Sequence, residues 1–139
     1  MSAVILGGLD IAALPAEVAP ARHWLCKLLC NDHNDIIDDV VLMACEAITN
    51  SIRHSDSADR DEDGKPGTVT LLVLADHGAL RIEVIDAGSR TSAPQVTDDD
   101  PNATSGRGLH MIDMLSAGRW GSYTHDDGRT VWFEIGLRP

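Results

Sequence analysis

Apolar residues recur along the chain with two different spacings. Between Ile36 and Ile52 they return every three or four positions, as on the buried face of an α-helix. Elsewhere, short runs rich in β-branched residues are bounded by Gly, Asp and Asn, a pattern typical of strands. The pattern predicts these elements in chain order: a strand at 4–11, helices at 15–30 and 35–54, strands at 68–75 and 80–85, a helix at 106–115, and strands at 118–124 and 129–137.

Two turn signals join the later strands into hairpins. Asp76-His77-Gly78 separates one pair of strands, and Asp127-Gly128 separates the other. We therefore expect an α+β fold, an α/β sandwich in which a mixed, mostly antiparallel sheet carries helices on one face. The 139 residues suit a single domain, 1–139, with a proper hydrophobic core. The polar segments 55–67 and 89–105 are predicted loops, and the second has the length of a functional lid.

The negative net charge of the chain argues against some classes of binding partner. Its 22 acidic and 11 basic side chains give a formal net charge of −11, which repels nucleic acid and anionic membranes. The first basic residue is Arg22 and the apolar run at 4–9 is short, so a signal peptide and a membrane span are not predicted. We expect a cytoplasmic protein whose three cysteines are reduced thiols.

Three polar residues recur at intervals of four in the predicted helix 35–54. At 100° per residue, Glu46, Asn50 and His54 fall within about 80° of one another, away from the apolar stripe. A solvated polar face is the ordinary explanation of such a set. The chemical alternative is that the Asn50 amide oxygen binds Mg²⁺ and Glu46 accepts a proton during phosphoryl transfer. His54 would then lie beside the phosphates.

A second candidate, Asp86-Ala87-Gly88, follows the predicted strand 80–85. Asp and Gly are standard turn residues, so an ordinary turn explains them equally well. A carboxylate at this position can also accept a hydrogen bond from an exocyclic amine such as that of adenine. Gly88 would let the backbone pass close to the ring.

A third candidate is the glycine-rich start of the predicted helix 106–115. Ser105-Gly106-Arg107-Gly108-Leu109 would place free backbone N–H groups where the helix dipole favours an anion such as phosphate. The stretch alone is a weak signal. It is neither a dinucleotide-binding fingerprint nor the phosphate loop of the G-x-x-x-x-G-K-[ST] type.

Taken together and in this order, the stretches resemble the GHKL superfamily of ATPases, over almost the whole chain. Glu46-x-x-x-Asn50-x-x-x-His54 looks like its N box and Asp86-x-Gly88 like its first glycine box. Gly106-x-Gly108-Leu109 looks like the second glycine box, and Gly128-Arg129-Thr130 like the closing strand motif.

That resemblance implies the Bergerat ATP-binding fold, with ATP and Mg²⁺ as cofactors. Asn50 would hold Mg²⁺, Asp86 would bind adenine with help from Thr130, and residues 89–105 would form the ATP lid. Glu46 would be the general base. The implied ligand-binding residues are Asn50, His54, Asp86, Gly88, Gly106, Arg107, Gly108, Leu109 and Thr130.

Within the superfamily, the chain looks most like the stand-alone anti-sigma factor serine/threonine kinases. Two segments carry this likeness: EAITNSIRH, and GRGLHMID followed by GRWG. This implies a protein kinase that binds a sigma factor or phosphorylates a serine or threonine of a small antagonist protein. The resemblance leaves a homodimer open. Two alternatives remain: a regulator of the same fold that binds partners without catalysis, and a free-standing ATP hydrolase or histidine-kinase-like enzyme.

One departure favours the non-catalytic alternative. The first glycine box of the family usually reads D-x-G-x-G, and here Arg90 replaces its second glycine. Arginine carries a Cβ and does not easily adopt positive φ. The sequence therefore predicts an altered lid hinge and weaker nucleotide binding.

Overall fold

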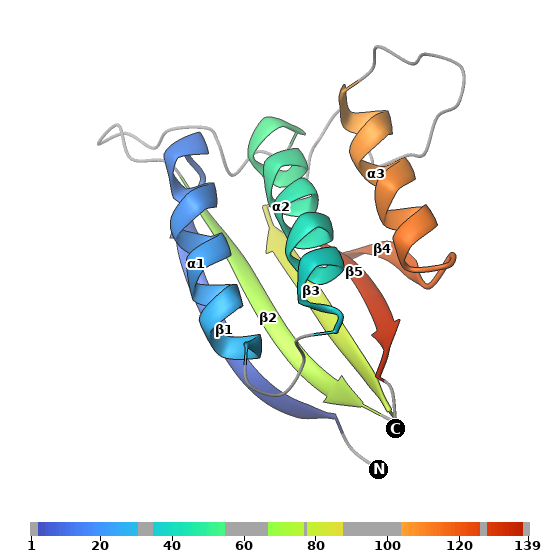
Figure 1. Ribbon diagram of the computed structural model, residues 1–139. Coiled ribbons are helices and arrows are strands. Elements are labelled where there is room, and N and C mark those ends of the chain that lie inside the picture. Colours follow the sequence, from blue (N-terminus) through green and yellow to red (C-terminus); the bar gives the residue numbers. More distant parts are fainter. Residues whose placement is uncertain are drawn as a thin grey trace.

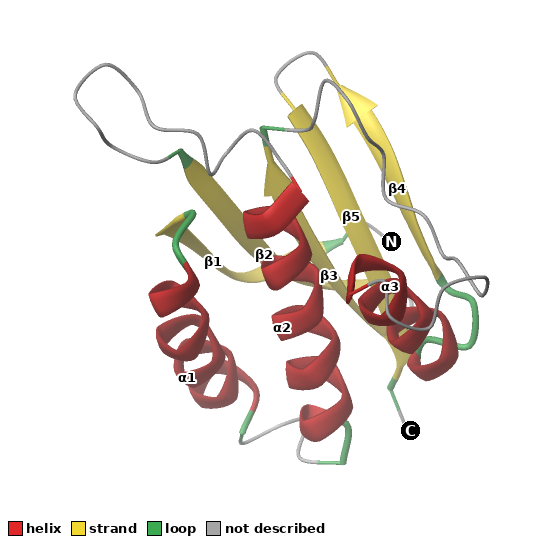
Figure 2. Ribbon diagram, turned by 90° about the horizontal axis from the view of Figure 1, so that it is seen from above, coloured by secondary structure: helices red, strands yellow, loops and turns green. Residues whose placement is uncertain are grey.

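A five-stranded antiparallel sheet carries a layer of helices on one face (Figures 1 and 2). The computed structural model describes residues 3–30, 35–54, 67–76, 78–87, 104–125 and 128–137, with only the backbone at 54 and 104–108. The elements are β1 Val4–Ala12, the 3₁₀ turn η1 Pro15–Glu17, α1 Val18–Leu29, α2 Ile37–His54, β2 Thr68–Asp76, β3 Ala79–Asp86, α3 Thr104–Leu115, β4 Trp120–His125 and β5 Gly128–Gly136. The predicted α+β sandwich is confirmed.

The strand order is β1-β2-β3-β5-β4, and each neighbouring pair is antiparallel. Alternate residues of β2 and β3 are buried, as expected for strands whose one face meets a helical layer. The helices contribute their apolar stripes to the same core. Its largest fully buried side chains include Leu25 and Leu29 of α1, Met43 and Ile48 of α2, Ile112 of α3 and Phe133 of β5.

The helix boundaries differ from the prediction for local reasons. The predicted helix 15–30 begins as the 3₁₀ turn, with Pro15 at its start, where a missing backbone N–H costs nothing. The helix α2 begins at Ile37, two residues later than predicted, and α3 begins at Thr104, two residues earlier. The strand β4 begins at Trp120 instead of residue 118.

The late start of β4 follows from how α3 ends. Ala117 and Gly118 have φ of 55° and 80°, and the Gly118 N–H donates to the Asp113 carbonyl at 2.8 Å. This left-handed cap satisfies the last carbonyl groups of the helix and excludes strand geometry at both residues. Among the described helices, none is long and apolar enough to span a bilayer.

The predicted turn between β2 and β3 contains Gly78, whose φ of 77° suits a hairpin turn. Asp127, of the second predicted turn, lies outside the described residues, while Gly128 begins β5. The predicted loop 55–67 is described only at residue 67, and the predicted lid 89–105 only at 104 and 105, which are the first residues of α3.

Candidate functional site

The four stretches predicted to form the site come together in the fold. The helix α2 packs against α3 and β3, and β3 pairs with β5. In Figure 1 the C-terminal ends of α2 and β3 and the N-terminal ends of α3 and β5 point to the upper side of the view. The fold therefore gathers the N box, Asp86 of the first glycine box, the second glycine box and the closing strand motif at one end of the sandwich.

The N-box face of α2 is only partly exposed. Glu46 and Asn50 are half-buried and lie one turn apart in an uninterrupted helix. The Asn50 side-chain nitrogen is buried, and no described residue accepts a hydrogen bond from it. Leaving such a donor unsatisfied costs about 1–3 kcal/mol, so this amide has the character of a ligand-binding group. His54 ends α2, and its side chain lies outside the described residues.

The carboxylate of Asp86 ends β3 in a buried position facing the helices. Directly opposite in the register lies Arg129 of β5. The Arg129 Nη2 is 3.5 Å from the Asp86 Oδ2, and the two side chains are 7% and 0% exposed. The Arg129 Nε is also buried and finds no acceptor within the described part of the chain. Asp86 and Arg129 thus form a buried ion pair, hereafter the Asp86–Arg129 pair.

No role is predicted for Arg129 from the sequence, because its pairing with Asp86 joins residues from strands that are not neighbours in sequence. The family resemblance implies instead that Thr130 assists Asp86. The register places Thr130 opposite Ile85, and side chains alternate along a strand, so Thr130 lies on the other face of the sheet. Its Oγ1 lies 3.1 Å from the His125 Nε2. The register therefore places Arg129 beside Asp86, and a role for Thr130 in binding adenine stays a prediction.

Gly128 holds the start of β5 against the end of β3. Its φ is 154°, and a Cβ built on it would overlap the Asp86 carbonyl oxygen and lie 3.0 Å from the Asp86 carbonyl carbon. No L-residue with a side chain fits this space without moving one of the two strands. The glycine of the closing strand motif is therefore a requirement of the close approach that makes the Asp86–Arg129 pair.

The second glycine box lies inside the first turns of α3. The predicted helix begins at Gly106, whereas the backbone is helical from Thr104 onward. The N–H groups of the N-cap and of the first three helical residues have no partner within a helix, and in α3 the three helical ones belong to residues 104–106. Gly106 is among them, whereas Arg107 and Gly108 are not.

Two further predicted residues stand apart. Leu109 is 2% exposed and belongs to the hydrophobic core, because its apolar side chain faces inward from α3. A ligand contact through the Leu109 side chain is therefore not supported. Gly88 and Arg90 lie outside the described residues.

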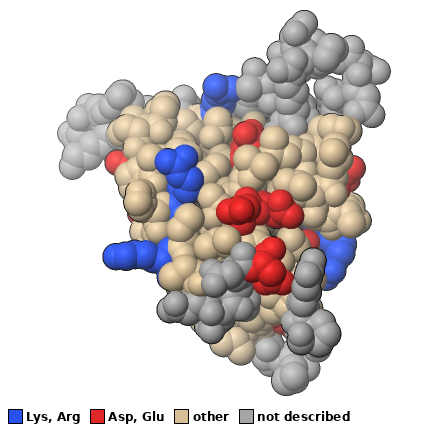
Figure 3. All heavy atoms as spheres, in the orientation of Figure 1, with Lys and Arg blue, Asp and Glu red and all other residues tan. Residues whose placement is uncertain are grey.

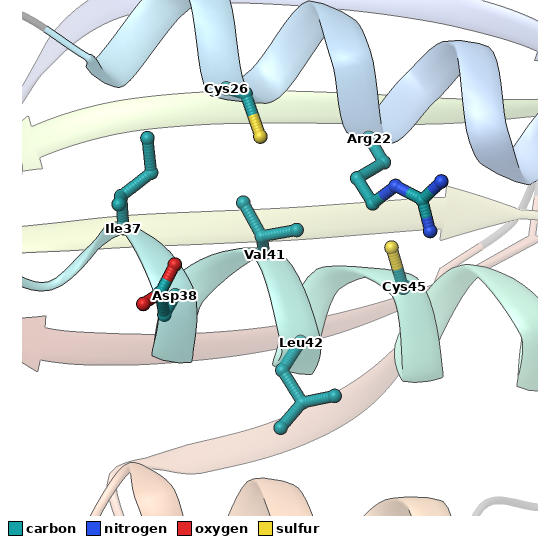
Figure 4. Close-up of a pocket in the computed structure, with 7 residues that line it drawn as sticks. All are labelled: Arg22, Cys26, Ile37, Asp38, Val41, Leu42 and Cys45. Atoms are coloured by element: carbon teal, nitrogen blue, oxygen red, sulfur yellow. The ribbon is translucent and has the colours of Figure 1, made fainter.

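A separate groove of about 480 Å³ lies between α1 and α2 (Figure 4). Its lining is mainly apolar and consists of Arg22, Cys26, Ile37, Asp38, Val41, Leu42 and Cys45. Burial raises the pKa of the Cys45 thiol, and the nearby Arg22 guanidinium offsets part of that rise. None of the predicted site residues lines this groove.

The helical face of the molecule has an acidic centre. Figure 3 shows Asp and Glu side chains grouped near the middle of this face. Asp38 and Asp39, in the first turn of α2, are both exposed. A face of this charge disfavours anionic partners, in agreement with the net charge of the whole chain.

The comparison with known protein families supports the predicted class of site. A family model described as histidine kinase-like ATPase domain matches residues 11–135, a span that contains each candidate site residue. No curated protein matches the sequence. An ATPase domain implies ATP binding, and the predicted likeness to the GHKL ATPases is confirmed at this level. The chain belongs to the family of histidine kinase-like ATPase domains.

Proposed function

We propose that this protein binds ATP with Mg²⁺ between α2, α3 and the ends of β3 and β5, and transfers the γ-phosphate to a serine or threonine of a partner protein. The partner would be a sigma factor or a small antagonist protein, as in the anti-sigma factor kinases that the sequence resembles. The observation that carries the proposal is the buried, unsatisfied amide of Asn50, one helical turn from Glu46, in an ATPase-family domain.

The chemistry of Asn50 fits a metal-bound nucleotide. Its amide oxygen is a hard ligand of the kind that Mg²⁺ takes beside water and phosphate oxygens. Its buried nitrogen is a donor without an acceptor among the described residues, and a phosphate oxygen or an ordered water would satisfy it. When bound, Mg²⁺ would neutralise charge on the phosphates.

Glu46 is the residue proposed to move a proton. As a carboxylate, it would accept the proton of the partner's hydroxyl while that oxygen attacks the γ-phosphorus and ADP departs. Its half-buried position on the same face as Asn50 supports this role, since the base and the metal ligand must reach one phosphate. Roles for His54, Gly88, Gly106, Arg107 and Gly108 in phosphate or base binding remain predictions.

The charge distribution supports a protein partner with basic residues. The net charge of −11 and the exposed Asp38 and Asp39 on the helical face disfavour nucleic acid and anionic membrane. A cytoplasmic location and a homodimer follow from the sequence and the resemblance alone, and both stay predictions.

Replacing Glu46 tests the catalytic part of the proposal. We expect Glu46→Gln to bind ATP as the wild type does and to transfer labelled γ-phosphate about 10²–10⁴-fold more slowly, because only the proton acceptor is removed. The phosphate acceptors in this assay would be candidate partner proteins whose genes neighbour the gene for this protein. Glu83→Gln is the matched control, since Glu83 pairs with Arg81 on the open face of the sheet. Transfer by Glu46→Gln at the control rate would refute Glu46 as the base.

A second candidate is a regulator that binds its partner but binds nucleotide poorly. The sequence favours it at one position, because Arg90 stands where the first glycine box of the resembling family has its second glycine. This candidate predicts a partner interaction that is insensitive to ATP, and micromolar Mg²⁺-dependent ATP binding would exclude it. Steady ATP turnover in the absence of any partner would instead favour a free-standing hydrolase.

A further inference from the structure

We propose that Arg129 is a base-selecting residue, and that the Asp86–Arg129 pair binds the edge of adenine that carries its amino group and the ring nitrogen N1. Asp86 would accept a hydrogen bond from the amino group, and Arg129 would donate one to N1. This inference rests on the proposed ATP site and specifies how that site would distinguish one base from another.

The geometry of the pair leaves an N–H donor of Arg129 without an acceptor among the described residues. The separation of 3.5 Å between Nη2 and Oδ2 is at the outer limit of a hydrogen bond, so the two groups are neighbours without close contact. A carboxylate offers about four lone-pair sites, and a guanidinium has about five N–H donors in a planar fork. One ligand can therefore engage both groups at once.

The strongest sign of a missing ligand atom is the Arg129 Nε. This donor is buried, and none of the described residues accepts a hydrogen bond from it. A buried N–H of a charged group without an acceptor is unfavourable, and native structures rarely keep one without a reason. The lone pair of a ring nitrogen held beside Asp86 would satisfy it.

The backbone fixes where Arg129 can act. It lies opposite Asp86 in the β3–β5 ladder, and the preceding Gly128 brings the two strands together at this point. Both side chains face the helical layer, as do Val84 and Val131 two residues away in each strand. The cation is thus positioned beside the carboxylate by the sheet itself.

The order of acceptor and donor suits adenine better than guanine. Adenine presents an amino donor next to the N1 acceptor, which complements a carboxylate next to a guanidinium. Guanine presents a carbonyl oxygen in place of that amino group and an N–H in place of that ring nitrogen. In the same pose its carbonyl would face Asp86 and its N–H would face Arg129, so both contacts would be repulsive.

The test is a double comparison of ligand and protein. ATP and 1-deaza-ATP, which has a C–H in place of N1, are titrated calorimetrically into the wild type, Arg129→Met and Arg129→Lys. We expect the wild type to bind 1-deaza-ATP about tenfold or more weakly than ATP, because a hydrogen bond from a charged donor is lost. Arg129→Met should bind the two nucleotides within about twofold of each other, and Arg129→Lys should show a smaller penalty than the wild type.

Two controls make the comparison specific. Arg119→Met changes an exposed arginine just before β4 and should retain the full penalty for 1-deaza-ATP. With the wild type, 7-deaza-ATP keeps N1 and should be bound more tightly than 1-deaza-ATP. Circular dichroism establishes that each variant is folded, and Arg129→Lys, which keeps the positive charge, carries the comparison should Arg129→Met fail to fold.

Each contrary outcome has a distinct meaning. ATP binding by the wild type with no penalty for 1-deaza-ATP, or a penalty that Arg129→Met retains, would overturn the role of Arg129 and leave the ATP site intact. GTP bound as tightly as ATP would overturn the assigned base edge. No binding of any nucleotide by the wild type would overturn the ATP site and this inference together.

Discussion

Gly128 joins the fold to the candidate site, and its replacement by alanine has a calculable consequence. A methyl group at this position would overlap the Asp86 carbonyl oxygen, with the Asp86 carbonyl carbon at 3.0 Å and the Ala87 Cα at 3.2 Å. These neighbours are backbone atoms, which cannot rotate away as the end of a side chain can. The end of β3 or the start of β5 would have to move.

The expected loss of stability has two parts. Forcing an L-residue into a sparsely populated backbone conformation such as φ 154° costs about 1–3 kcal/mol. Overpacking against rigid neighbours costs about 1–3 kcal/mol more. The sum of about 2–6 kcal/mol is a large share of the roughly 5–15 kcal/mol by which a domain is stable, so Gly128→Ala should melt about 8–24 °C lower.

Chemical and thermal denaturation followed by circular dichroism measure this loss. Gly136→Ala is the matched control, because Gly136 is in the same strand and the nearest atom to its added Cβ is the Arg119 Nη1 at 3.7 Å, an ordinary contact. We expect the control to lie within about 0.5 kcal/mol of the wild type. If Gly128→Ala were as stable as Gly136→Ala, the close approach of β3 and β5 would be wrong, and the basis for the Asp86–Arg129 pair would be lost.

Three further predictions concern stability away from the site. Ala117→Gly should raise the free energy of unfolding by about 0.5–1 kcal/mol in urea titrations, because Ala117 has φ 55° and glycine adopts this conformation without strain; a destabilised variant would contradict the left-handed helix cap. Trp120→Phe should lower it by about 1–2 kcal/mol, since the indole N–H donates to the Asp113 carboxylate at 2.8 Å; an unchanged value would show that this bond contributes nothing. The pKa of Cys45 is raised by burial, so the unfolded chain loses this proton first and the wild type should lose stability as pH rises above the ordinary value of 9.0. Cys45→Ala should lose less stability over the same pH range, and equal losses would show that the thiol is not desolvated.

Most of the fold was predictable because it rests on local patterns. The stripe through Val40, Ala44 and Ile48 predicts α2 within two residues, since burying one face of a helix requires this spacing. Alternation along β2 and β3 predicts both strands for the same reason. The ends of α3 were harder to predict, because the helix continues through the glycine-rich segment at its start and closes with a left-handed alanine.

The candidate site was predictable in its members and less so in their contacts. Glu46 and Asn50 were found because one helix fixes their spacing. Arg129 was missed because its partner Asp86 lies on a strand distant in sequence, and only the observed register brings the two together. A shift of one residue in that register would have placed Thr130 beside Asp86 instead, and no local pattern decides between the two.

The groove between α1 and α2 also could not be predicted from the sequence. Its lining residues read as ordinary helix positions, and the groove exists only because α1 and α2 pack side by side on the sheet (Figures 1 and 4). The depth of packing between two helices depends on tertiary contacts that hydrophobic periodicity does not encode.

The central claim is that this end of the sandwich binds ATP with Mg²⁺ through Asn50. Calorimetric titration of the protein with ATP and ADP, with and without Mg²⁺, tests it most directly when Asn50→Ala is titrated beside the wild type. The account predicts micromolar ATP binding that requires Mg²⁺ and is weakened at least about tenfold in Asn50→Ala. Absence of ATP binding by the wild type, or equal Mg²⁺-dependent binding by Asn50→Ala, would contradict it.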